Sequence, residues 1–267
     1  MNYDIDISNV VLKTERLTLR PWKLDDLDDF YEYASVDGVG EMAGWPHHKS
    51  KADSLNILHH FIDHKRTFAI EYNNKVIGSL GVELYDENLL PELKDYKARE
   101  IGYVLSKDYW GLGLMPEAVK RVIDYLFNEV KLDVLVCGHY DFNNQSRRVQ
   151  EKCGFKHYKH IDKFKSIIYD KIDGYASLLF NNNVEIKDPS IILRMNVDRI
   201  HTTELGYERI GRVLNYNDNI DYIKNVITDY KSNIIKNGKN YYIEYNGYNI
   251  CVNSNSYTVI TVKKING

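Results

Sequence analysis

The stretch SKDYWGLGLMPEAVKRVIDYLFNEV, residues 106–130, decides the fold of the first part of the chain. Pro116 favours the first turn of a helix, where its missing N–H breaks no hydrogen bond. Apolar residues then recur at helical spacing and define one buried face: Val119, Val122, Ile123, Leu126, Phe127 and Val130. The stretch therefore predicts a long amphipathic helix that begins near Pro116.

Two glycines, Gly111 and Gly113, lie directly before this helix and follow a predicted strand at 99–106. Glycines let the backbone turn sharply and direct several N–H groups toward an anion at the helix N-terminus. A diphosphate would suit such a site. The same pattern also occurs in a plain tight turn, so the glycines alone leave both interpretations open.

Strand and helix patterns alternate on both sides of this helix. The predicted order is a strand at 14–22, helices at 23–35 and 51–66, a hairpin at 67–85 that turns at Asn73-Asn74, the strand and helix described above, a strand at 132–140, a short helix between Asn143 and Gly154, a strand from Phe155 and a last strand at 174–180.

Several short motifs stand in this order along the chain: Thr14 to Leu17, Arg20-Pro21, Ile77-Gly78-Ser79, Glu100 to Tyr103, Tyr109 to Gly113, Glu117-Ala118 and Asn143 to Phe155. Together they resemble the GNAT N-acetyltransferases over roughly residues 10–180, and the RimJ/RimL-like ribosomal-protein alanine acetyltransferase branch in particular. The resemblance implies an α/β fold with a mixed, mostly antiparallel sheet flanked by helices. It also implies transfer of an acetyl group from acetyl-CoA to a primary amine, a protein N-terminus or a small molecule, in a ternary complex.

The same resemblance implies where acetyl-CoA would bind. The strand 101–105 would splay away from 134–137, and the pantetheine arm would fill the gap. The expected cofactor-binding residues are Val104, Leu105, Trp110, Gly111, Leu112, Gly113, Leu114, Asn143 and Arg148. Asn143 is equally suited to be a plain helix N-cap, and Arg148 to be a solvated surface residue.

The proton donor departs from the family pattern. Many members carry a tyrosine as general acid where this chain has Gln150, and an amide has no transferable proton. Water, Ser146 or Tyr140 would then protonate the departing thiolate, unless it leaves unaided, and Ser146 is the candidate we assign. A Gln at this position is also consistent with an inactive scaffold that binds CoA without transferring an acetyl group.

A base must remove a proton from the amine. Glu100 is the first candidate, with Glu83 on the hairpin as an alternative and His139 as a third choice because its pKa lies in a useful range. Glu100 is as readily explained as a partner of a surface ion pair.

The acceptor side of the site is expected around Trp45 and His47, because in this fold the corresponding loop lines the acceptor cleft. His60 and His64 are spaced to share a metal on one helix face, but no carboxylate stands in register with them. We therefore expect substrate-binding residues Trp45, His47 and Glu83, and no metal.

The second part of the chain begins after a polar stretch at 181–190. Helices are expected on either side of 201–203 and from 217 to 237, the last ending at Gly238, followed by strands with an Asn246-Gly247 hairpin turn. The expected domains are 1–182 and a small α+β domain at 190–267. The motif His201 to Gly206, with Ser256 to Thr261, resembles a bacterial domain family of unknown function.

The polar residues of this second part allow two interpretations: His201, Glu204, Arg209, Lys239, Ser256 and Thr258. They would form a polar cluster of the kind that small ribonuclease-like domains carry on a sheet, and residues 190–267 hold ten Lys and Arg against seven Asp and Glu. Helix capping explains the same residue types more simply. RNA binding is thus the alternative function, confined to this domain.

Composition limits the remaining function classes. The chain has 267 residues, 43% hydrophobic and 27% charged, with a formal charge of −3, which argues against bulk nucleic-acid binding. No apolar stretch suits a membrane span, and three widely spaced cysteines are expected as free thiols in a reducing cytoplasm. A cytoplasmic monomer or homodimer is expected, with acetyl-CoA and an amine as partners.

Overall fold

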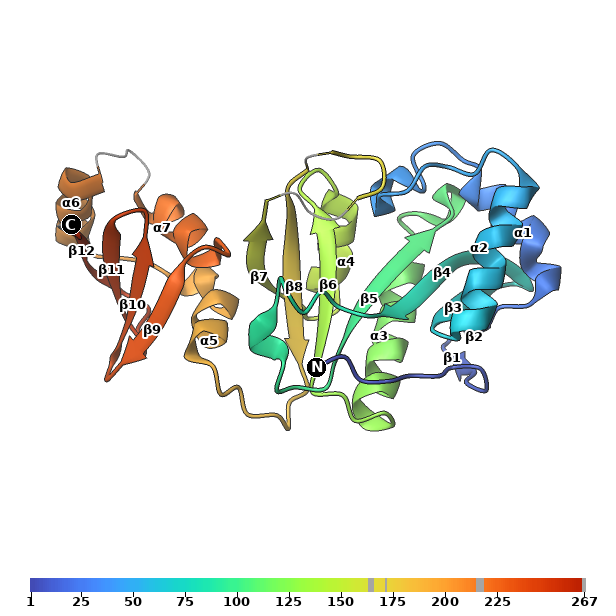
Figure 1. Cartoon of the computed structure of the whole chain (residues 1–267), viewed down its shortest axis with the longest axis horizontal. Helices are drawn as coiled ribbons and strands as arrows, with labels where there is room; N and C mark the ends of the chain where they lie inside the picture. The colour runs from blue at the N-terminus through green and yellow to red at the C-terminus, as the bar shows by residue number, and fades with distance from the viewer. Residues whose placement is uncertain (163–165, 171, 215–218, 266–267) are drawn as a thin grey trace. The chain divides into compact units, whose positions relative to one another are not determined.

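The computed structural model describes residues 1–162, 166–170, 172–214 and 219–265. Contacts divide the chain into two compact units (Figure 1). The first unit comprises Met1–Phe155 and Asp162–Val184, and the second comprises Lys156–Ile161 and Glu185–Gly267. The two units are therefore interleaved along the chain.

One mixed sheet of eight strands has the order β1-β2-β3-β4-β5-β6-β8-β7. The strands are β1 (Leu12–Lys13), β2 (Leu17–Pro21), β3 (Thr67–Tyr72), β4 (Lys75–Glu83), β5 (Ala98–Leu105), β6 (Val134–Tyr140), β7 (Lys156–Ile161) and β8 (Gly174–Phe180). The pairings from β1 to β5 and of β6 with β8 are antiparallel, and only β5 with β6 is parallel among the registers described. The predicted fold class is confirmed.

Helices cover both faces of this sheet in the first unit (Figure 1). They are α1 (Leu27–Ala34), α2 (Lys51–His64), α3 (Leu114–Asn128) and α4 (Asn144–Lys152), with 3₁₀ turns η1 (Leu24–Asp26), η2 (Glu41–Ala43), η3 (Pro91–Leu93) and η4 (Lys107–Tyr109). Alternation along β5 sorts its side chains, because Ile101 and Leu105 join the core with α3 whereas Val104 packs with Phe30 of α1 and Leu58 of α2.

Local sequence signals account for several of these elements. Ser50 caps α2 by accepting a hydrogen bond from the Asp53 N–H, at 3.3 Å. Asn73 and Asn74 have φ values of 49° and 61°, the left-handed pair that a type I′ hairpin turn requires. Both the helix and the hairpin are confirmed.

A nearly buried ion cluster fixes the start of the α1 region. Arg20 on β2 donates to both carboxylate oxygens of Asp26, each at 2.8 Å, and to Glu71 on β3 at 2.7 Å. The Arg20 and Asp26 side chains are only 13% and 7% exposed. These residues tie η1 to the sheet beneath it.

The second unit has its own core between helices and a sheet of order β12-β11-β10-β9. Besides β7, its elements are α5 (Pro189–Met195), η5 (Val197–Arg199), α6 (Glu204–Leu214), α7 (Asn219–Thr228), β9 (Asn233–Asn237), β10 (Asn240–Tyr245), β11 (Tyr248–Asn253) and β12 (Val259–Lys264). Asn246 and Gly247, with φ of 47° and 76°, form the predicted turn. Within the described ranges, no helix of the chain combines the length and apolar character needed to cross a membrane.

The predicted helix from 217 to 237 is wrong in its second half, and its first two residues lie outside the described residues. α7 ends at Thr228, and Ile234 lies in β9 opposite Ile243 of β10. Gly238, with φ 58°, belongs to the hairpin turn between these strands rather than to a helix end. A β-branched cross-strand pair stabilises the strand here, which helical periodicity alone does not reveal.

Candidate active site

A left-handed glycine turn leads into α3. Gly111 and Gly113 have φ values of 79° and 76°, and Gly113 is the N-cap of α3. The first N–H groups of a helix have no partner inside it, so the turn presents donors to an anion. Trp110 fastens the turn to the end of β5 because its Nε1–H donates to the Leu105 carbonyl, at 2.8 Å. Four of the five predicted residues, Trp110, Gly111, Leu112 and Gly113, lie in this turn, and Leu114 is the first residue of α3.

β5 and β6 separate beside this turn. Three residue pairs join them, from Ala98 opposite Val134 to Glu100 opposite Val136. β5 stays paired with β4 as far as Leu105, so along 101–105 its other edge lies beyond the described pairing with β6. The splay therefore begins after Glu100, whereas the family resemblance suggested that it would include Val134. Val104 and Leu105 lie along this edge.

Asn143 and Ser146 lie at the start of α4. Asn143 Oδ1 accepts from the Ser146 N–H at 3.0 Å, so the N-cap role is present, and its Nδ2 donates to the Met42 carbonyl at 2.9 Å. Tyr103, from the splayed half of β5, has its hydroxyl 3.0 Å from Ser146 Oγ. Burial raises the pKa of Tyr103 well above its usual value. Arg148 is exposed on α4.

His139 and Gln150 form a buried pair on the α4 side of β6. His139 Nδ1 lies 3.1 Å from Gln150 Oε1, and Gln150 Nε2 donates to the Gly138 carbonyl at 3.0 Å. Burial is the main reason why the pKa of His139 is lowered from its usual value. His139 is thus placed with α4, while the register puts Glu100 on the opposite face of the sheet.

Glu100 and Glu83 are direct cross-strand neighbours on β5 and β4. Glu83 also accepts a hydrogen bond from the Thr67 hydroxyl, at 3.2 Å. Two residues along the same strands, Gly81 pairs with Gly102. Because glycine has no side chain, no side chain projects from the sheet at that pair beside the carboxylates. Two acids directly opposite one another repel, so a cation above this face would be stabilised.

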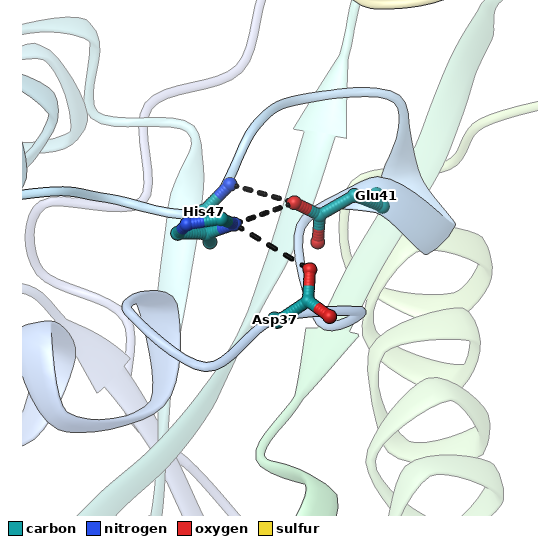
Figure 2. Close-up of side chains that lie close together, drawn as sticks. All are labelled: Asp37, Glu41 and His47. Atoms are coloured by element: carbon teal, nitrogen blue, oxygen red, sulfur yellow. Dashed lines mark hydrogen bonds and ion pairs between the residues drawn. The ribbon is translucent and has the colours of Figure 1, made fainter.

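The loop between α1 and α2 carries the predicted acceptor residues. Figure 2 shows His47 beside Glu41 and Asp37, with its Nδ1 2.9 Å from Glu41 and 3.7 Å from Asp37. Burial of the Glu41 carboxyl would raise its pKa, but hydrogen bonds from the backbone N–H groups of His47 and Gly38 and from the His47 ring bring it down to about 2. Trp45 is half-buried against His48, with ring centroids 5.1 Å apart.

Ligand-atom spacing alone would let Asp37, Glu41 and His47 surround a metal ion. The Glu41 oxygens already accept from Gly38 and His47, and the Asp37 side chain is 90% exposed. These contacts hold the loop between α1 and α2 together, and this structural role is sufficient to explain why the three side chains lie close. Glu41 and Asp37 have no assigned role in the sequence patterns, and their only signal is that they are acids six and ten residues before His47.

In the second unit, three of the predicted polar residues meet. Thr258 Oγ1 lies 3.1 Å from His201 Nε2 and 2.8 Å from Ser256 Oγ, while His201 Nδ1 lies 2.9 Å from the Arg199 carbonyl. Among the described contacts, none joins Glu204 or Arg209 to this group. The Thr203 hydroxyl accepts from the Gly206 N–H at 3.1 Å, so the capping role of this motif is also present.

Comparison with known proteins bears on both units. The acetyltransferase (GNAT) domain family matches residues 16–156, and a family of unknown function, DUF3781, matches 194–263. The uncharacterized N-acetyltransferase p20 of Bacillus licheniformis is 28% identical over 129 residues, covering 46% of this chain and 68% of that protein. The uncharacterized N-acetyltransferase YoaA of Bacillus subtilis is 25% identical over 153 residues, covering 55% of this chain and 82% of that protein.

Solved structures share the fold at low identity. A GNAT-family acetyltransferase from Bacillus anthracis has a TM-score of 0.57 at 22% identity, covering 65% of this chain and 100% of that one. The ribosomal-protein-S5-alanine acetyltransferase of Vibrio fischeri has a TM-score of 0.53 at 20% identity, covering 66% of this chain and 100% of that one. These likenesses concern the fold alone.

Sheet, splay and glycine turn together define an acyltransferase domain that uses a CoA thioester. The chain belongs to the GNAT acetyltransferase family, and it carries a DUF3781 region after that domain. It is therefore an acetyl-CoA-dependent acyltransferase with N-acetyltransferase relatives, which confirms the resemblance seen in the sequence.

Proposed function

We propose that the first unit transfers the acetyl group of acetyl-CoA directly to a primary amine, a protein N-terminus or a small-molecule amine, in a ternary complex. One observation supports this above all: the splayed edge along 101–105, the glycine turn and Ser146 lie around the end of β5. A bound thioester would thus have its arm, its diphosphate and its sulfur served by neighbouring groups.

Backbone groups carry most of the cofactor binding in this proposal. Backbone groups near Val104 and Leu105 would pair with the pantetheine arm, and the N–H groups of 111–114 would bind the diphosphate. The Trp110 N–H, also expected there, donates to the Lys107 carbonyl at 3.1 Å instead. Asn143 would offer pantetheine its second amide N–H, and exposed Arg148 would meet a CoA phosphate. Acetyl-CoA supplies the activated acyl group as a thioester.

Proton handling falls to three side chains. Glu100 would take the proton that the amine loses on attack, with Glu83 opposite as the second candidate. Ser146 would give a proton to the sulfur as the carbon–sulfur bond breaks. A cationic amine would be attracted to the paired carboxylates, while Trp45 and His47 would shape the acceptor side.

A direct test uses the full chain. Acetyl-CoA should raise the melting temperature, and CoA release should be seen with at least one class among N-terminal peptides, polyamines and aminoglycosides. Glu100→Gln should abolish most turnover, whereas Glu208→Gln, a matched change on exposed α6, should not. Absence of the thermal shift at millimolar acetyl-CoA, or of CoA release with every class of amine, would refute the proposal.

A second candidate function rests on the second unit. The Arg199 carbonyl can only accept, so the neutral imidazole of His201 has its proton on Nδ1 and its Nε2 accepts from Thr258. An oriented imidazole of this kind suits a general base for RNA cleavage. Single-stranded RNA binding or cleavage by the full chain, lost in His201→Ala, would support it, and equal activity of that variant would exclude it.

For the whole protein we propose a cytoplasmic location and a monomer or homodimer. Support for the location comes from the cysteines, since Cys137, Cys153 and Cys251 are all free and buried. Light scattering after size-exclusion chromatography measures the oligomeric state. Domain limits of 1–182 and 190–267 remain a prediction, which limited proteolysis would test.

A further inference from the structure

A small polar cluster lies beneath α4, where the family tyrosine is replaced by Gln150. Gln150 and His139 are 2% and 7% exposed, so both polar side chains are removed from water. Buried polar groups are costly unless their hydrogen bonds are made, and a fully satisfied pair is held rigidly. The hydrogen bonds of Gln150 and His139 therefore indicate the role of the pair.

Chemistry fixes the direction of each bond. The Gly138 carbonyl can only accept, so the Gln150 amide nitrogen must face it, at 3.0 Å. The amide oxygen is then turned to His139, at 3.1 Å, and His139 must carry its proton on Nδ1. The contacts thus fix a proton on Nδ1, and the lowered pKa that burial gives His139 favours the neutral imidazole.

The other N–H of Gln150 reaches the hydroxyl of Ser146. Gln150 Nε2 lies 3.4 Å from Ser146 Oγ, and the Tyr103 hydroxyl, which donates to the Ser146 carbonyl at 3.1 Å, lies 3.0 Å from the same Oγ. A donor aimed at an oxygen, here the Gln150 N–H, stabilises the negative charge that grows on that oxygen when it gives up its proton. Ser146 stands at the splay, where the proposed function needs a proton donor.

We infer that Gln150, held in one orientation by His139, positions Ser146 as the group that protonates the departing CoA thiolate. The inference rests on the proposed function of the first unit. In the balanced step, the amine nitrogen bonds to the acetyl carbon and the carbon–sulfur bond breaks. The amine proton passes through Glu100 to water, the Ser146 proton passes to sulfur, and water returns a proton to Ser146. Gln150 and His139 are positioning residues and exchange no proton.

A purely structural role is the competing explanation. β6 has left β5 at Gly138, and Gln150 would then serve only to satisfy an unpaired carbonyl. In that case the loss of Gln150 would weaken the fold around the splay, and its effect on turnover would not depend on Ser146. The two explanations therefore differ in how Gln150 and Ser146 combine.

The first measurement does not depend on enzyme activity. Imidazole nitrogen NMR of the full chain at neutral pH should give His139 as the neutral Nδ1–H tautomer, assigned by its loss in His139→Leu. Gln150→Leu should release that tautomer preference. A neutral Nε2–H form in the unaltered protein would overturn the inference whether or not the enzyme is active.

The second measurement is a double-mutant cycle with any amine that supports turnover. Ser146→Ala should lower kcat about 100-fold, and Gln150→Leu about tenfold, with the acetyl-CoA KM changed by less than about twofold. In the Ser146→Ala background, Gln150→Leu should cost nothing further. His139→Asn, whose amide N–H replaces Nδ1–H, should keep kcat, whereas His139→Leu should behave like Gln150→Leu.

The outcomes separate the two claims. An equal fall in kcat caused by Gln150→Leu with and without Ser146 would overturn the positioning role. Where Gln150→Leu does not fold, the nearly isosteric Gln150→Glu replaces it, since it keeps the acceptor for His139 and loses the N–H groups for Ser146 and for the Gly138 carbonyl. Lack of CoA release by the unaltered protein with every amine would instead refute the proposed function.

Discussion

Adding one methyl group to β4 should disturb the cofactor strand. Gly78 pairs with Leu105, and a Cβ on Gly78 would lie 2.4 Å from the Val104 carbonyl oxygen. Ordinary contact begins at 3.4 Å, so the end of β5 must move by about 1 Å in Gly78→Ala. Gly102 offers a matched control, because in the described part of the chain no atom lies within 4 Å of its added Cβ.

The magnitude follows from two opposing effects. Alanine is preferred over glycine inside a strand by about 0.5–1 kcal/mol, which favours both variants. Overpacking costs about 1–3 kcal/mol and applies only to Gly78→Ala. That variant should lose about 1–2 kcal/mol of unfolding free energy, or roughly 2–8 °C in melting temperature for a unit of this size, whereas Gly102→Ala should be unchanged or slightly stabilised.

Tryptophan fluorescence is a suitable assay. The three tryptophans, Trp22, Trp45 and Trp110, all lie in the first unit, so their signal follows its unfolding alone. Acetyl-CoA should stabilise Gly102→Ala as it does the unaltered protein, and Gly78→Ala much less, since the Val104 backbone is displaced. Equal melting temperatures of the two variants would refute the steric reasoning.

Three further predictions follow from single contacts. Arg20→Met should cost about 3 kcal/mol in guanidinium unfolding, because it leaves the buried Asp26 carboxylate unpaired; a loss below about 1 kcal/mol would contradict this. Glu41→Gln should be less stable than the unaltered protein at pH 7. The folded pKa of Glu41, about 2, lies below its ordinary 4.5, so this difference should shrink as the pH falls from 4.5 through 2; a pH-independent difference in urea midpoints would count against it. Gly113→Val should abolish stabilisation by acetyl-CoA, since its φ of 76° strains a β-branched residue, and an unchanged thermal shift would exclude a role for the turn.

Much of the fold was predictable because its signals are local. The apolar face around Val122 and the asparagine turn at Asn73 depend on residues a few positions apart. The structure of the second half of the 217–238 segment could not be predicted, because the position of Ile234 suits a helix face as well as a strand. Only its partner Ile243, in β10, decides between them.

In the candidate site too, some features depend on residues close in the sequence and others on packing. Gly111 and Gly113 could be recognised from the helix that follows them, whereas the partnership of Gln150 with His139 depends on how α4 packs on β6. Likewise, the sequence of β5 does not mark Glu100 as the last residue before the splay. That point is set by where β6 turns away, which is a property of the packed sheet.

The splay gives the sheet an inner edge. Strand edges with unpaired N–H and C=O groups invite strands of other molecules, and proteins usually cover or charge them. Here the edge along 101–105 lies in the middle of the sheet, and in the proposed function the co-substrate would cover it. A bound CoA arm would therefore act as a removable strand, and CoA would protect the purified protein from association as well as serve its chemistry.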